Sequence, residues 1–298
     1  MDISNNIDFV IPLHRYHYLI RATLEAITTF YNPRNIYIIT PKENIDILNK
    51  MSNNWNIKKI IIYDDETFFI QNYKLLKIDI EKYYKYIDEK SREFGWWYQQ
   101  LIKLGSFKQI KNLSDPYVVW DSDLIPLIKW NIYNKSNNYK FAILQEKSQT
   151  IWHTEQYRDS IYELAKINVK VLDEGTFVPH HFIMYHNVLY NLLNHIEYEN
   201  KDKDNWILCI IKLSNKYYRF SEYMLLASYT IDYFPNMLNY YEFKLYGKYG
   251  IRIRNSKDFL EKIVLKCDIK EGISYITFCN YIKIIYRNLP TYIQIEHI

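Results

Sequence analysis

The sequence predicts an α/β fold in which helices cover a mainly parallel sheet. Three apolar, strand-like runs lie within the first 65 residues and are separated by helical patterns, an order typical of βαβ units. Gly contributes only 6 and Pro only 8 of the 298 residues, which excludes linker-like and low-complexity chains. Because ligands of open parallel sheets bind at the carboxyl ends of the strands, we expect the functional residues at that edge.

The first half of the chain alternates strands and helices regularly. An apolar run over 7–13 is followed by polar residues and then by helical spacing over 18–30. A break around Pro33 precedes a second strand over 36–39. The same alternation predicts a helix over 41–53 and a third strand over 59–63, which ends at Asp64 and Asp65.

The second half is also α/β but less regular. A long helix is predicted over 93–111, and the strand-like run from Tyr117 to Trp120 ends in Asp121-Ser122-Asp123. Further elements follow in the order strand 139–145, strand 176–185, helix 188–197, helix 221–233 and a mixed C-terminal region 259–285. We interpret the whole chain, 1–298, as a single domain.

Several common chemistries are excluded by what the sequence lacks. The six glycines form neither a dinucleotide-binding fingerprint nor a Walker A loop. The widely spaced Cys209, Cys267 and Cys279 form no CxxC pair and favour a reducing compartment. With 38 basic and 34 acidic residues, the charge is unlike that of a dedicated nucleic-acid binder. Without a signal-peptide pattern or a long apolar run, we expect no membrane span and a cytoplasmic protein, in the host cytoplasm if the chain is viral.

The pattern Asp-x-Asp occurs twice and is informative once. Asp202 and Asp204 lie in a polar run that is typical of a solvated loop. Asp121 and Asp123 instead end a buried-looking strand, where residues i and i+2 point the same way. Two such carboxylates present hard oxygen ligands to one Mn²⁺ or Mg²⁺ ion, which also prefers phosphate oxygens. The alternative is a turn that caps the strand.

Five segments follow one another between residues 7 and 235: IPLHRYHYLI, GWWYQQLIKL, VVWDSDLIPL, FVPHHFIMYH and FSEYMLLASY. In this order the sequence resembles nucleotide-sugar-dependent glycosyltransferases of the GT-A fold, and among them a bacterial and giant-virus family described mainly as a domain of unknown function. The resemblance implies a GT-A-like, Rossmann-like sheet with a C-terminal elaboration. It also implies a nucleotide diphosphate sugar donor, a divalent metal and an acceptor of unspecified type.

The resemblance assigns parts of the chain to the donor. It implies a nucleotide-binding half over 7–130, an acceptor-side half over 131–240 and the C-terminal elaboration over 241–298. Asp121 is implied to contact the donor ribose or the metal, and Asp123 to be a metal ligand. The residues implied to hold the nucleotide follow the first and third strands: Pro12, His14, Arg15 and Asp65.

Two further segments point to donor or metal binding. In the predicted helix 93–111, Gln100 and Lys103 lie beside the apolar stripe, where they are able to reach a sugar or a phosphate. His180 and His181 follow a strand-like run, and one imidazole, His180 in preference, is expected to complete the metal site. The alternative for each of these residues is an ordinary structural role.

Ser221 and Glu222 begin the predicted helix 221–233. Ser is a favourable N-cap, and a carboxylate in the first turn is favoured by the helix dipole, so a purely structural role is one interpretation. In inverting enzymes that the sequence resembles, the catalytic base is a carboxylate at the start of a helix. The resemblance therefore implies that Glu222 deprotonates the attacking hydroxyl.

The function expected from the sequence is a metal-dependent transfer of sugar from a nucleotide diphosphate, with UDP as the expected nucleotide, to a carbohydrate or protein-glycan acceptor. The expected ion is Mn²⁺ or Mg²⁺, and a monomer or homodimer is expected. Two alternatives remain open: a nucleotidyltransferase or sugar pyrophosphorylase, and an inactive module that binds nucleotide sugars.

Overall fold

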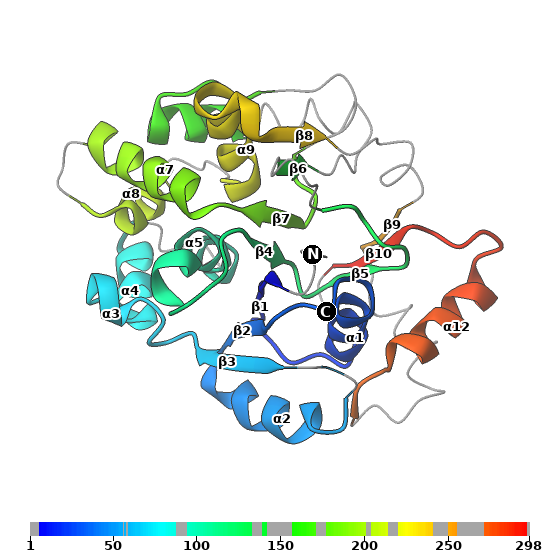
Figure 1. Ribbon diagram of the computed structural model, residues 1–298. Helices are drawn as coiled ribbons and strands as arrows, with labels where there is room; N and C mark the ends of the chain where they lie inside the picture. The colour runs from blue at the N-terminus through cyan, green and yellow to red at the C-terminus, as the bar shows by residue number, and fades with distance from the viewer. Residues whose placement is uncertain are drawn as a thin grey trace.

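The centre of the molecule is a five-stranded sheet in the order β3-β2-β1-β4-β7 (Figure 1). The computed structural model describes residues 6–55, 57, 59–87, 94–132, 139–141, 157–170, 177–200, 204–213, 220–240, 250–254 and 271–296. The sheet consists of β1 (Phe9–Pro12), β2 (Ile36–Thr40), β3 (Ile60–Asp64), β4 (Tyr117–Trp120) and β7 (His181–Met184). The first four strands are parallel to one another, so the mainly parallel sheet expected from the sequence is confirmed.

Two smaller sheets lie beside the central one. In the first, β5 (Leu124–Pro126) pairs antiparallel with β10 (Tyr292–Ile295), which pairs parallel with β9 (Ile251–Ile253). In the second, β6 (Tyr139–Phe141) pairs with β8 (Leu238–Tyr240). The first sheet brings the C-terminal region directly beside the residues that follow β4.

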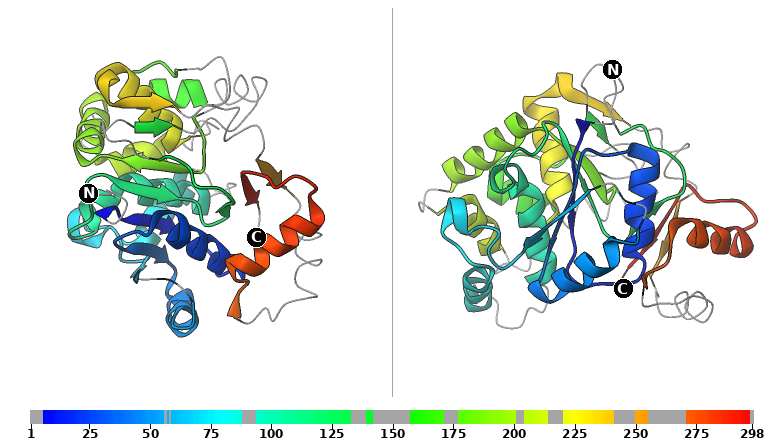
Figure 2. Two further views of the ribbon diagram at one scale, coloured as in Figure 1. Left: turned by 45° about the vertical axis from the view of Figure 1, so that its right-hand side comes forward. Right: turned by 60° about the horizontal axis from the view of Figure 1, so that its bottom comes forward.

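Helices cover both faces of the central sheet, with α1 on one side and α5 on the other (Figure 2). Helix α12 (Tyr275–Ile285) lies beside α1 (Ile20–Tyr31), and α2 (Lys42–Ser52) lies along β3. The others are α3 (Ile70–Tyr73), α4 (Lys77–Ile87), α5 (Phe94–Gln109), α7 (His186–Glu199), α8 (Trp206–Lys212), α9 (Glu222–Tyr233) and the 3-10 turn Pro235–Met237. Among the described residues, no helix combines the length and the apolar character that a membrane crossing needs.

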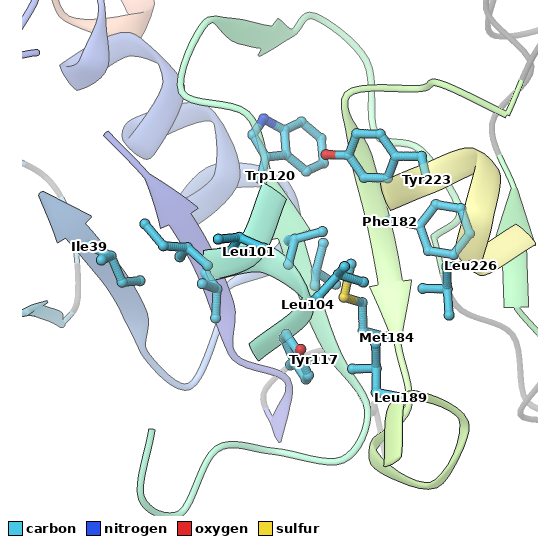
Figure 3. Packing of buried hydrophobic residues seen from close by; sticks show 14 of the residues in the cluster. Ile39, Leu101, Leu104, Tyr117, Trp120, Phe182, Met184, Leu189, Tyr223 and Leu226 are labelled. Carbon is cyan, nitrogen blue, oxygen red and sulfur yellow. The ribbon is translucent and has the colours of Figure 1, made fainter. Parts of the chain in front are cut away.

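The main core lies between α5 and the central sheet. Leu101 and Leu104 of α5 are fully buried and lie among Ile39 of β2, Tyr117 of β4 and Met184 of β7 (Figure 3). This packing explains why the helix is apolar on a wide face. It also fixes the rotation of α5, so that the residues beside the apolar stripe face the end of β4.

One expectation about the sheet is wrong. The sequence suggested that the strand before His180 and His181 ends there and runs parallel to the others. Instead, β7 begins at His181 and is antiparallel to β4, with Trp120 opposite His181. The chain turns at His180, which has a positive φ of 61°. Asp202 and Cys267, like positions 142–145 of the expected strand, lie outside the described residues.

His17 gives the fold a predictable sensitivity to acid. It is 8% exposed, and in the described part of the chain neither ring nitrogen has a hydrogen-bond partner. Burial lowers the pKa of His17 to about 4. The unfolded chain binds this proton near pH 6.5, so stability is unaffected above that pH and falls as the pH drops from there toward 4. At pH 5 we expect a loss of about 2 kcal/mol from this residue.

Urea unfolding of the wild type and His17→Phe at pH 7.5 and pH 5 measures this loss. Burial lowers the pKa of His181 to about 3, so His181 adds a loss of the same sign in both proteins. The difference between the two proteins therefore isolates His17. Equal pH dependence in both would contradict the expectation.

Candidate active site

Two carboxylates lie where β4 ends. All four residues of β4 are buried, and the chain turns directly after them into β5. The Asp121 N–H donates to the His180 carbonyl over 2.8 Å, and the Leu124 N–H donates to the Asp121 carbonyl over 3.1 Å. These bonds fix the backbone on both sides of Asp121. Asp121 and Asp123 therefore lie at the carboxyl edge of the sheet, where the sequence predicted them.

Asp121 is held by a buried lysine. Lys103 of α5 is 2% exposed, and its Nζ lies 2.5 Å from Asp121 Oδ1. The Tyr223 hydroxyl donates to the same oxygen over 3.1 Å, and the Lys103 Nζ lies 4.6 Å from the centre of the Tyr223 ring. Such a charge is tolerated in a buried position because it is paired and hydrogen-bonded.

Glu222 is the second partner of that lysine. Its Oε1 lies 2.7 Å from the Lys103 Nζ, and its backbone N–H donates to Gln100 Oε1 over 3.0 Å. The Ser221 hydroxyl accepts from the Met224 N–H over 3.3 Å, so the expected N-cap of α9 is confirmed. Lys103 thus joins the end of β4 to the start of α9.

His180 reaches the carboxylates from the turn before β7. Its Nδ1 lies 3.0 Å from Asp121 Oδ2, and its buried Nε2 has no partner in the described part of the chain. His181 points elsewhere: its ring packs against Trp120 and Trp130, with centroids 4.7 and 4.4 Å apart. Of the two histidines that the sequence offered, His180 is therefore the one beside Asp121.

The two aspartates have opposite electrostatic environments. Burial by itself raises the pKa of Asp121, but Lys103 and His180 outweigh it and hold this pKa well below its ordinary value. For Asp123, burial and the negative charge of Asp121 raise the pKa to about 6. Burial likewise raises the pKa of Glu222, although Lys103 opposes it. Asp123 is therefore the carboxylate that gains most from an added cation.

The carboxylates at the end of β4 suit a divalent cation that is coordinated partly by the protein and partly by a bound ligand. In the described ranges no three His, Cys, Asp or Glu side chains are arranged to hold a metal by themselves. Both oxygens of Asp121 are engaged by Lys103, Tyr223 and His180, which leaves Asp123 as the available carboxylate. Mg²⁺-like ions are commonly bound by one or two carboxylates together with substrate phosphates. The residues fit that arrangement and do not form an all-protein metal cage.

The residues implied to hold a nucleotide lie at the same edge of the sheet. Pro12 is the last residue of β1, and His14 and Arg15 follow it with exposed side chains. Asp65 follows β3 and is buried, with Oδ2 2.6 Å from Lys77 Nζ. Asp65 is thus buried and paired with Lys77, whereas the side chains of His14 and Arg15 are exposed and accessible to a ligand.

Helix α5 connects this region to the carboxylates. A Cβ atom at Gly95 in its first turn would lie 3.7 Å from the His14 ring. Lys103 lies eight residues further along, about 12 Å at the helical rise. Gln100, between them, contacts the start of α9. One helix therefore passes beside both the open residues after β1 and the carboxylates after β4.

Two side chains at the site were missed from the sequence. Tyr223 follows Glu222 and resembles an ordinary helix residue until its hydroxyl is placed on Asp121. Gln294 lies on β10, and its Nε2 lies 3.0 Å from His180 Nδ1. The only sequence signal for Gln294 is a polar residue within the apolar run YIQI.

Several solved structures align with most of the chain. Mouse xyloside xylosyltransferase 1 covers 97% of this chain and 97% of its own at 6% identity and a TM-score of 0.46. Core-mannan synthase A from Aspergillus fumigatus, in its Mn/GDP form, covers 80% of this chain and 72% of its own at 9% identity and a TM-score of 0.46. The galactosyltransferase LgtC, with donor and acceptor sugar analogues, covers 97% of this chain and 87% of its own at 10% identity and a TM-score of 0.41. With TM-scores below 0.5, these likenesses carry no weight in assigning a function.

The sequence comparisons give a family. No curated protein matches the sequence. A model of a family of unknown function, DUF6492, matches residues 4–270, which include both aspartates, the two histidines and Glu222. The chain belongs to the DUF6492 family.

Proposed function

We propose that the protein is a metal-dependent glycosyltransferase that moves a sugar from a nucleotide diphosphate, with UDP as the expected nucleotide, to an acceptor hydroxyl of a carbohydrate or protein glycan. The observation that carries the proposal is the contrast at the end of β4. Asp121 is paired with Lys103, while Asp123 beside it has a raised pKa and forms no ion pair within the described part of the chain. A divalent cation held by Asp123 would relieve that imbalance.

The residues of the chain have distinct roles in this proposal. When bound, a divalent cation would offset the charge that develops on the leaving diphosphate. Asp123 ligates that cation, and Lys103 keeps Asp121 ionised and fixed beside it. Arg15 and His14, open after β1, contact the nucleotide, and α5 spans the distance between them and the carboxylates.

The transfer exchanges one bond for another at the anomeric carbon of the sugar. The acceptor oxygen bonds to that carbon while the bond from the carbon to the diphosphate oxygen breaks, and the acceptor proton must be removed. Glu222 is proposed as the base that takes it, since burial raises its pKa and Lys103 fixes its position. This role belongs to an inverting course.

A panel of nucleotide diphosphates and nucleotide sugars, each with and without Mn²⁺, tests the proposed function. One nucleotide is expected to raise the melting temperature only with Mn²⁺, by about 5 °C at saturating concentration. With the matching sugar donor, the expected product is the nucleoside diphosphate. Release of pyrophosphate would instead indicate the nucleotidyltransferase alternative, and binding without turnover would indicate an inactive module. No effect of any nucleotide would contradict the proposal.

Glu222→Gln is expected to lower turnover about 100-fold while donor affinity changes little, because a carboxamide cannot accept the proton. Lys103 keeps Asp121 as a partner, so the variant still folds. Steady-state rates per folded molecule give the result. Glu25→Gln is the matched control, since Glu25 is also a buried helix carboxylate, 2.8 Å from Arg21 on α1. Wild-type turnover in Glu222→Gln would make Glu222 purely structural.

A further inference from the structure

Strand β10 carries one buried polar side chain. All four of its residues are buried, and Gln294 is 3% exposed. Its neighbours Ile293 and Ile295 belong to an apolar cluster with Ile125 and Phe278. Since side chains alternate along a strand, Gln294 faces away from that cluster. A buried amide is costly unless its polar atoms find partners, so the partners of Gln294 show what the strand contributes.

Those partners are residues of the candidate active site. The Gln294 Nε2 lies 3.0 Å from His180 Nδ1, and its side chain is hydrogen-bonded to Asp123. The backbone of the same strand also holds Asp123, because the Ile295 N–H donates to the Asp123 carbonyl over 3.1 Å. The pairing of Gln294 with Leu124 sets this register. Strand β10 therefore contacts both the main chain and the carboxylate of Asp123.

We propose that Gln294 is a positioning residue that orients the Asp123 carboxylate toward a divalent cation beside His180. This inference rests on the proposed function and deepens it, because it names the side chain that holds the available carboxylate. The DUF6492 match ends at residue 270, so β10 lies beyond the matched segment. Asp123 thus comes from the matched segment, and its partners on β10 come from a strand after it.

The chemistry of an amide suits this role. An amide N–H donates to Asp123 without adding charge, so it fixes the carboxylate and leaves its negative charge for the cation. A lysine at 294 would place a competing positive charge there, and a leucine would release the carboxylate. Hydrogen bonds from a second layer of residues commonly orient metal ligands, and their loss costs about 10–100-fold in metal affinity or activity.

The first test measures Mn²⁺ binding, by the electron paramagnetic resonance signal of free Mn²⁺, alone and with UDP or GDP. Gln294→Leu is expected to bind Mn²⁺ about 10–100-fold more weakly than the wild type. Gln109→Leu is the matched control, since Gln109 on α5 is buried and its Oε1 accepts from Asn72 over 3.0 Å. It is expected to bind like the wild type.

The outcomes separate the two proposals. Wild-type affinity in Gln294→Leu, with binding lost in Asp123→Asn, would overturn the positioning role and leave the proposed function standing. If the wild type binds no Mn²⁺ under any of these conditions, the proposed function fails and the role of Gln294 toward a cation fails with it. Weaker Mn²⁺ binding in Gln294→Leu, with wild-type binding in Gln109→Leu, supports the role.

A second variant gives a readout that needs no metal. Gln294→Glu would place a third carboxylate beside Asp121 and Asp123, so without metal its melting temperature is expected to fall at pH 7.5 and to recover at pH 5.5. Mn²⁺ is expected to restore it at pH 7.5. A melting temperature equal to that of the wild type at both pH values would show that position 294 does not face the carboxylates, and would overturn the proposal.

Discussion

Lys103→Met is expected to lower the free energy of unfolding by about 3–5 kcal/mol. The Lys103 ammonium lies between Asp121 and Glu222, 2.5 and 2.7 Å from their oxygens, and is almost fully buried. Methionine has a similar volume but leaves two buried carboxylates without their cation. Unfolding in urea at pH 7.5, compared with the wild type, measures the loss.

The pH dependence of that loss identifies its cause. Without Lys103, the carboxylates of Asp121 and Glu222 are expected to have raised pKa values, so lowering the pH to 5 is expected to protonate them. The difference in free energy of unfolding between the variant and the wild type is then expected to become smaller. Lys82→Met is the control, because Lys82 is 70% exposed and lies 3.8 Å from Asp79. It is expected to change stability by less than about 1 kcal/mol. A Lys103→Met protein as stable as the wild type would contradict the proposed ion-pair network.

Asp123→Asn is expected to abolish Mn²⁺-dependent binding of the nucleotide while the protein remains folded. The carboxamide keeps one neutral oxygen but loses the charge that a hard cation needs. It also removes the repulsion that raises the pKa of Asp123, so stability without metal is expected to stay equal or to rise slightly. Calorimetric titration of nucleotide with Mn²⁺ gives the affinity.

Asp204→Asn is the matched control for that experiment. Asp204 belongs to the other Asp-x-Asp pattern and forms an ion pair with Lys212 at the end of α8. It is expected to bind nucleotide and Mn²⁺ like the wild type. If Asp123→Asn bound nucleotide with Mn²⁺ at the wild-type affinity, Asp123 would not be a metal ligand.

The local patterns of the sequence predict the first half of the fold well. The strands and helices over 9–52 end no more than one residue beyond the expected ranges, because each apolar face is buried against the next element along the chain. The edge at which Asp121 and Asp123 lie also follows from the sequence, since it depends only on a strand that ends there.

Long-range pairing is what the sequence does not predict. His180 does lie beside Asp121, but it precedes an antiparallel strand, whereas the expectation placed it after a parallel one. Alternation along a strand carries no information about the direction of its neighbour. Gln294 escaped notice for a related reason: β10 is a short run whose partner, β5, lies about 170 positions earlier. Lys103 was expected at a ligand, and only the packing of α5 shows that it joins two carboxylates.

The side chains around Asp121 and Asp123 form one cluster with Lys103, His180, Glu222 and Gln294, and their separation along the chain has a kinetic consequence. Its members come from α5, the end of β4, the turn before β7, the start of α9 and β10, so most bonds among them close a long loop of chain. Closing such loops costs entropy that local contacts do not, and contacts of this kind form late in folding. Until β10 pairs with β5, Asp123 lacks both its backbone and its side-chain partners. We therefore expect the cluster to form late in folding, so that substitutions in it speed unfolding more than they slow refolding.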